Sequence, residues 1–132
     1  MPEKKTIERA KQDEREGKAP TTQAGEFVHE EIDHIREGKH GARSAKQAIA
    51  IGLSKARRAG VKLPPPKKGT TSPETRRKAE RDIERGQRAT KPAAKRSTAR
   101  LKALKREPRS AASHEALSRQ AKQAAARRRR AS

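Results

Sequence analysis

Apolar residues recur with a helical period in two neighbouring segments of the chain. In Gln23–Glu37 and again in Ala45–Ala59, apolar positions follow one another at steps of three and four residues. This spacing places them on one face of an α-helix, so each segment is predicted to form an amphipathic helix. The apolar positions are Ala24, Phe27, Val28, Ile32 and Ile35 in the first segment, and Ala45, Ala48, Ile49, Gly52, Leu53 and Ala56 in the second.

Capping signals mark the ends of both predicted helices. Ser44 stands three residues before Gln47, which is the pattern of a capping box at the start of the second helix. Gly60 follows the basic last turn of this helix as a C′ residue, and Pro64–Pro66 prevent the helix from continuing. Thr21–Thr22 offers an N-cap to the first helix.

The short turn Gly38–Arg43 between the two helices predicts an antiparallel helical hairpin. Ile49 and Leu53 should then pack against the apolar face of the first helix, which is formed by Val28, Ile32 and Ile35. The first helix also carries an acidic ridge, which should face the basic side of the second helix. It would orient the hairpin, or restrain the basic helix until nucleic acid competes for it. The ridge consists of Glu26, Glu30, Asp33 and Glu37.

The segments on either side of the hairpin contain few large apolar side chains. Pro2–Glu16 has only Ile7, so we expect a fraying helix there rather than a part of the core. Beyond Gly69 the helices should be polar almost all round, and nothing would stabilise them alone in water. They are predicted at Pro73–Arg85, with Ser72 as N-cap and Gly86 as the stop, at Thr90–Arg106, and from Ser110 or Ser113 into Arg127–Arg130.

These patterns predict an all-α protein with one small folded unit. Nine large apolar side chains lie between Thr22 and Leu63, which is few for the chain entropy that folding must overcome. The expected organisation is a charged N-terminal helix (1–20), a helical hairpin (21–63), a Pro/Lys linker (64–72) and an extended, partly disordered basic arm (73–132).

Composition strengthens the expectation of partial disorder. Of the 132 residues 29% are hydrophobic, the net charge is +20, and Phe27 is the single aromatic residue. Low hydrophobicity combined with high net charge is typical of chains that do not fold completely. The sequence has no cysteine for disulfides or thiolate metal sites, no apolar run of about 20 residues, and a charged N-terminus unlike a signal peptide. We therefore expect a soluble cytoplasmic protein.

The charge is divided unevenly along the chain. Met1–Arg43 carries nine Lys and Arg residues against ten Asp and Glu, whereas Ser44–Ser132 carries 27 against six. Such asymmetry indicates a nearly neutral head and a cationic arm.

The central part of the sequence also resembles a known family. The run GKHGARSAKQAIAIGLSKARRAG, within a similarity that extends from about Lys4 to Gly69, resembles a family of small, basic bacterial proteins of unknown function. This resemblance implies a bacterial, soluble, helical protein and carries no catalytic residues. The tail rich in Ala, Lys, Arg and Pro is similar to a linker-histone tail in composition only.

Candidate catalytic and metal sites have little support in the sequence. The run HEEIDH places His29 and His34 five residues apart, about 140° on a helix, unlike the four-residue spacing of the zinc motif HExxH. With His40 in the turn a metal cluster is conceivable, but the interpretation is that these are ordinary polar-face histidines. Glu30 and Glu31 point in different directions, and no nucleophile constellation is present. We expect no enzyme activity, no cofactor and no metal.

Basic clusters separated by Ala, Pro and Ser favour a polyanion as partner. Duplex DNA is favoured because its dense phosphates reward counterion release, whereas binders of single strands need aromatic side chains. The expected function is non-specific DNA binding or compaction by a histone-like accessory protein of the nucleoid. Two alternatives remain open, an RNA- or ribosome-associated protein and a protein-interaction adaptor with a basic tether, and self-association through the hairpin is possible. The predicted phosphate contacts are Lys46, Lys55, Arg57, Arg58, Lys67, Lys68, Arg76, Arg77, Lys95, Arg96, Arg100, Lys105, Arg106, Arg127, Arg128, Arg129 and Arg130.

Overall fold

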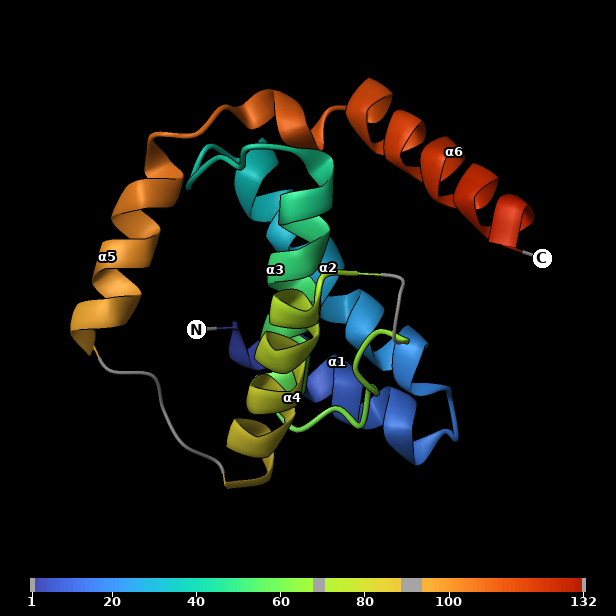
Figure 1. Cartoon of the computed structure of the whole chain (residues 1–132). Helices are drawn as coiled ribbons and strands as arrows, with labels where there is room; N and C mark the ends of the chain where they lie inside the picture. The colour runs from blue at the N-terminus through green and yellow to red at the C-terminus, as the bar shows by residue number, and fades with distance from the viewer. Residues whose placement is uncertain (1, 68–70, 89–93, 132) are drawn as a thin grey trace. The chain divides into compact units, whose positions relative to one another are not determined.

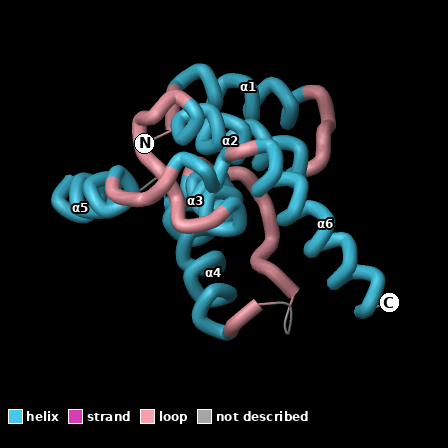
Figure 2. Tube along the Cα trace, turned by 90° about the horizontal axis from the view of Figure 1, so that it is seen from above, coloured by secondary structure: helices cyan, strands magenta, loops and turns pink. Residues whose placement is uncertain are grey.

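The computed structural model describes residues 2–67, 71–88 and 94–131, of which residues 88, 94, 95 and 131 are described by their backbone alone. Within these ranges the chain forms helices joined by loops and no sheet, which confirms the predicted all-α class (Figures 1 and 2). The helices are α1 (Lys4–Arg15), α2 (Pro20–Arg36), α3 (Ala45–Arg58), α4 (Pro73–Arg88), α5 (Ala94–Lys105), the short 3₁₀ helix η1 (Arg109–Ala112) and α6 (His114–Ala131).

The chain divides into two compact units that are interleaved in sequence. Unit 1 contains residues 1–30 and 50–92, and unit 2 contains residues 31–49 and 93–132. Each of the helices α2 and α3 therefore contributes one part to each unit. This grouping does not follow the linear order of head, hairpin, linker and arm that the sequence suggested.

Most local capping signals act as the sequence predicted, but Thr21–Thr22 do not cap α2, because this helix already begins at Pro20. The backbone N–H of Gln47 donates to Ser44 Oγ at 3.1 Å, and Gln47 Oε1 accepts from the N–H of Arg43 at 2.6 Å. At the other end of α3, Gly60 has φ +99°, and the amides of Gly60 and Val61 donate to carbonyls of the last helical turn. This is a Schellman motif, which needs a residue at positive φ.

The core of unit 1 is built mainly from small side chains around one aromatic ring. Phe27 is 1% exposed, and Ile7 and Leu53 pack against the cluster to which it belongs. The buried members of this cluster are Ala10, Ala24, Phe27, Ala56, Val61 and Leu63. The cluster draws on α1, α2, α3 and the loop after α3.

Helix α1 is part of this core, contrary to the expected fraying helix. Thr6, Ala10 and Asp13 are buried at i, i+4 and i+7, so they form one continuous helix face. This face packs through small and polar residues, so a prediction based on large apolar side chains does not detect it. Two members of the predicted acidic ridge also face α1. Glu30 Oε1 accepts from the backbone N–H of Glu3 at 2.7 Å, and burial together with Asp13 raises the pKa of Glu26.

Helices α2 and α3 pack closely, as the predicted hairpin requires. A Cβ added to Gly52 of α3 would lie 2.6 Å from Val28 Cα of α2, so the two backbones meet at this glycine. The apolar stripe is divided between two clusters, however. Leu53 packs in unit 1, whereas Ile32 and Ile35 belong to a second cluster in unit 2.

Helix α4 is also packed against its unit, contrary to the expected polar helix in a free arm. Ala79 and Asp82 are 5% and 7% exposed. Ser72 caps the helix as predicted, because the N–H of Thr75 donates to its Oγ at 3.2 Å. Gly86 does not end the helix. A Cβ at Gly86 would lie 2.1 Å from the carbonyl oxygen of Arg57, so this glycine permits close contact with the end of α3.

In unit 2, residues from the expected arm cover the turn between α2 and α3. The backbone N–H of Gly41 donates to the carbonyl of Leu104, and that of Ala42 donates to Pro108, each at 2.9 Å. The buried cluster here consists of Ile35, Ala42, Ala48, Ala111 and Ala112, with Ile32 packed against it. Residues 104–112 are therefore a structural part of this unit. Ser113, one of two predicted caps, begins α6 by accepting from the N–H of Ala116 at 3.1 Å.

Candidate nucleic-acid interface

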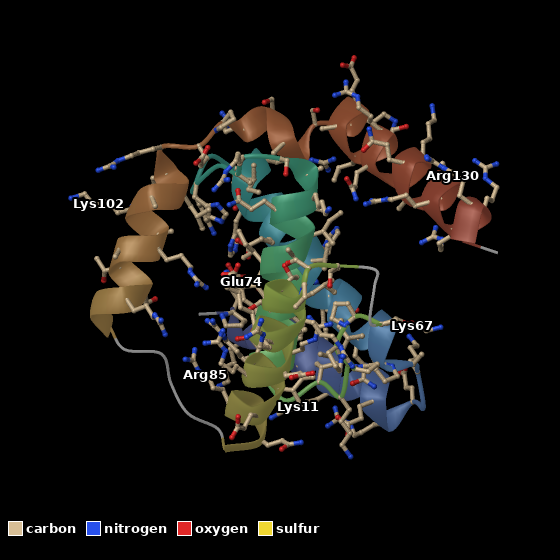
Figure 3. The ribbon with its side chains drawn as sticks, in the orientation of Figure 1. Lys11, Lys67, Glu74, Arg85, Lys102 and Arg130 are labelled. Carbon is tan, nitrogen blue, oxygen red and sulfur yellow. The ribbon has the colours of Figure 1, made fainter. Side chains whose placement is uncertain are left out.

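A strongly cationic surface lies at the C-terminal end of α6. Arg127–Arg130 are all exposed, and successive residues of a helix point about 100° apart. The four guanidinium groups therefore project to all sides of the last helical turn rather than to one face. Figure 3 shows the Arg130 side chain pointing away from this end of the helix.

Helix α5 and the segment after it present a second group of exposed cations in unit 2. Arg96, Arg100, Lys105 and Arg106 are exposed, and so is Lys102, which the sequence reading did not single out (Figure 3). Leu101 on the same helix is 44% exposed. Most of the side chains that the structure describes on α5 are therefore exposed, which leaves these charges at the surface.

A polar hollow in unit 2 brings together cations that are distant in sequence. It has a volume of about 480 Å³ and lies where the start of α3 meets η1 and α6. Arg43, Lys46 and Arg119 line it, together with one carboxylate, Glu115, and the serines Ser44, Ser110 and Ser113. Only Lys46 was predicted as a phosphate contact. No sequence pattern pointed to Arg43 and Arg119, because only the packing of residues 108–112 on the turn brings them to this hollow.

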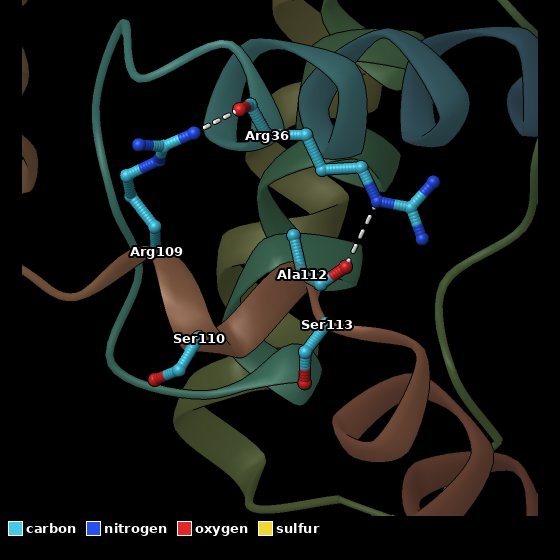
Figure 4. Close-up of a pocket in the computed structure, with 5 residues that line it drawn as sticks. All are labelled: Arg36, Arg109, Ser110, Ala112 and Ser113. Carbon is cyan, nitrogen blue, oxygen red and sulfur yellow. Dashed lines mark hydrogen bonds between the residues drawn. The ribbon is translucent and has the colours of Figure 1, made fainter.

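Two other arginines of unit 2 are used within the fold. Arg36 Nε donates to the carbonyl of Ala112 at 3.0 Å (Figure 4). Arg109 donates to the carbonyls of Ile35 and Arg36 at the end of α2. Cations favour the carbonyl end of a helix, so this pair stabilises the joint between α2 and η1.

Unit 1 also uses several of the predicted phosphate contacts internally. Arg57 is 8% exposed, and its guanidinium donates to the carbonyls of Leu63 and Pro64. Burial lowers the pKa of Arg57, and the nearby charge of Asp82 acts in the opposite direction. Arg58 Nε donates to Asp82 Oδ1 at 2.8 Å. We therefore leave Arg57 out of the interface, since its charge is enclosed by the loop after α3.

The remaining predicted contacts of unit 1 are spread over its surface. Arg76 Nε donates to the carbonyl of Pro66 at 3.2 Å, and Arg77 Nε donates to that of Pro73 at 3.4 Å. Lys67 and Arg77 are exposed, while Lys55, Arg58 and Arg76 are half-buried. Lys68 lies outside the described residues, as does the side chain of Lys95.

Three side chains that could hold a metal ion meet in unit 2, although the sequence reading expected none. Glu31 and His34 lie one turn apart on α2, and His40 reaches them from the loop that follows. His40 is not an ordinary polar-face histidine, because it is 6% exposed and Glu31 is 0% exposed. His29, in contrast, is exposed.

Comparison with known proteins gives one match. Residues 4–68 match the model of a family of unknown function, DUF6496. The chain is similar to this family over that segment. No curated protein and no solved structure matches the chain. Among the described residues, no helix is both long and apolar enough to cross a membrane.

Proposed function

We propose that the protein binds nucleic acid without sequence specificity, through contacts between exposed arginine and lysine side chains and phosphate groups. The observation that carries this proposal is the run of four exposed arginines at the end of α6. Unit 2, which contains it, carries 17 Lys and Arg residues against five Asp and Glu. A surface so rich in one sign of charge attracts polyanions and releases the counterions that they hold.

Duplex DNA is the favoured partner in this proposal. Binders of single strands stack bases on aromatic side chains, but Phe27, the one aromatic residue, is 1% exposed. Phosphate contacts orient a protein on a duplex and carry no sequence information. We therefore propose an accessory, histone-like role in the nucleoid. The alternative of double-stranded RNA rests on the same contacts with A-form phosphates.

The test is a salt titration of binding to a fluorescent DNA duplex, measured by anisotropy. For duplex DNA, log K falls with log salt by about 0.9 for each phosphate that the protein neutralises. Replacing Arg127–Arg130 by alanine should lower the magnitude of this slope by about 3–4 if all four reach phosphates. Affinity should fall to the same extent on DNA duplexes of different sequence. The same titration with an RNA duplex compares DNA and RNA as partners.

Substitution is preferable to truncation because residues 104–112 cover the turn between α2 and α3. A matched control replaces Lys4, Lys5, Arg9 and Lys11 of α1 by alanine. These four side chains are also exposed, and their replacement removes the same charge as the α6 variant. This control should lower the slope by less than the α6 variant. Equal slopes for the wild type, the α6 variant and the α1 control would exclude the end of α6 as the binding surface.

A further inference from the structure

The ring of His40 is held between two oxygen atoms in the interior of unit 2. Its Nδ1 lies 2.9 Å from the carbonyl oxygen of Gly41, and its Nε2 lies 2.8 Å from Glu31 Oε1. The carbonyl oxygen can only accept, so Nδ1 carries the hydrogen of this bond. In a neutral ring Nε2 then has a lone pair, and it faces a carboxylate oxygen. A positive centre is needed between these two atoms, which is either a proton or a metal ion.

His34 supplies a third ligand atom at the same place. The ligand atoms of Glu31, His34 and His40 all lie within 4.8 Å of one another. The His34 and His40 rings meet edge to face, with centroids 6.4 Å apart. A proton shared between Glu31 and His40 needs only two groups, whereas a metal ion uses all three.

The surrounding fold holds His40 in the orientation of a metal ligand. A histidine that binds a metal through one ring nitrogen usually donates the hydrogen of the other to a carbonyl or carboxylate. His40 Nδ1 has this partner in its neighbour Gly41, whose own N–H is bonded to the carbonyl of Leu104 at 2.9 Å. A Cβ at Gly41 would lie 1.8 Å from the carbonyl oxygen of Glu107, so the loop is closely enclosed there.

We propose that Glu31, His34 and His40 bind a divalent transition-metal ion, with zinc as the preferred ion. Two imidazoles and one carboxylate form a ligand set that zinc accepts, with a water molecule completing four-coordination. Zinc bonds to nitrogen and oxygen are about 2.0–2.2 Å long, so tetrahedral ligand atoms lie about 3.3–3.6 Å apart. The Nε2–Oε1 distance of 2.8 Å would widen slightly, and the ion would link α2 to the loop that carries His40.

The test uses the full-length protein after treatment with a chelator and dialysis. Zinc titration by calorimetry should show one site per chain, and excess zinc should raise the melting temperature. Cobalt(II), used as a spectroscopic probe, should give the strong visible bands of a four-coordinate site. His34→Gln should weaken zinc binding at least tenfold, and so should Glu31→Gln and His40→Gln.

His29→Gln is the matched control, because His29 is exposed on the same helix and lies outside the cluster. It should leave zinc affinity and the cobalt spectrum unchanged. If the buried Glu31 and His40 variants do not fold, the half-buried His34 variant decides, with its helix content checked by circular dichroism. Folded wild-type protein without saturable zinc binding would overturn the proposal, as would equal losses in the His29 and His34 variants.

Discussion

At the scale of single residues, buried charged side chains hold helices together through hydrogen bonds, which the composition did not predict. Asp82 on α4 is 7% exposed and accepts from Ser54 Oγ at 2.5 Å and from Arg58 Nε at 2.8 Å. These bonds join α4 to α3 in unit 1. A carboxylate with two such donors stabilises the packing of a helix that has few large apolar side chains.

Replacing Asp82 by alanine should therefore destabilise the protein by about 1.5–3 kcal/mol, the range for hydrogen bonds to charged groups. The measurement is urea unfolding followed by circular dichroism. Glu80→Ala is the control on the same helix. The Glu80 side chain is 51% exposed, and its ion pair with Arg76 is long, at 3.9 Å. That change should stay within about 0.5 kcal/mol. A similar loss in both variants would contradict the role of Asp82.

At the scale of elements, glycines and alanines determine how closely the helices approach. Gly52 meets Val28, and Gly86 meets the carbonyl of Arg57, so in each case a backbone occupies the space of a side chain. Alanine normally favours a helix over glycine by about 0.8–1.0 kcal/mol. At these two contacts the steric cost should exceed that gain.

Gly86→Ala should thus destabilise the protein, by about 1–3 kcal/mol for an overpacked site. Gly25→Ala is the matched comparison, because Gly25 lies within α2 and its added Cβ would meet nothing within 4 Å. It should stabilise the protein by up to about 1 kcal/mol. Thermal unfolding of the two variants measures the difference, and a stabilising Gly86→Ala would show that α4 does not pack as described.

The same elements show what the sequence could and could not predict. The class, the helices α2 and α3 and the caps at Ser44, Gly60 and Ser72 were predictable, because capping depends on residues three or four positions apart. The packed face of α1 could not be predicted, since it is formed by small and polar residues such as Ala10. Gly86 resembled a helix stop in sequence, and only its contact with Arg57 reveals another role. The cluster of Glu31 and His34 with His40 likewise depends on the path of the loop.

At the scale of the whole molecule, each of the two units combines segments that are distant from one another in the sequence. Ile35, Ala42 and Ala48 of unit 2 are buried together with Ala111 and Ala112. The core of this unit therefore needs residues that lie more than 60 positions after Ala48.

Removing residues 93–132 should expose the part of the chain from 31 to 49. Hydrogen exchange, read by mass spectrometry, should show faster exchange there than in the full-length protein, because unit 2 loses its covering residues. Amides of α1 and α4 should keep most of their protection, since both belong to unit 1. Unchanged exchange at residues 31–49 would show that this segment folds without its C-terminal partners.

The distance between Ala48 and Ala112 also has a consequence for biosynthesis. A ribosome adds about 5–20 residues per second, so roughly 3–13 seconds separate the synthesis of these two residues. During that time the nascent chain presents Ile35, Ala42 and Ala48 without the residues that cover them. Unit 2 must therefore close after most of the chain has been translated, and chaperones have several seconds in which to bind the uncovered turn.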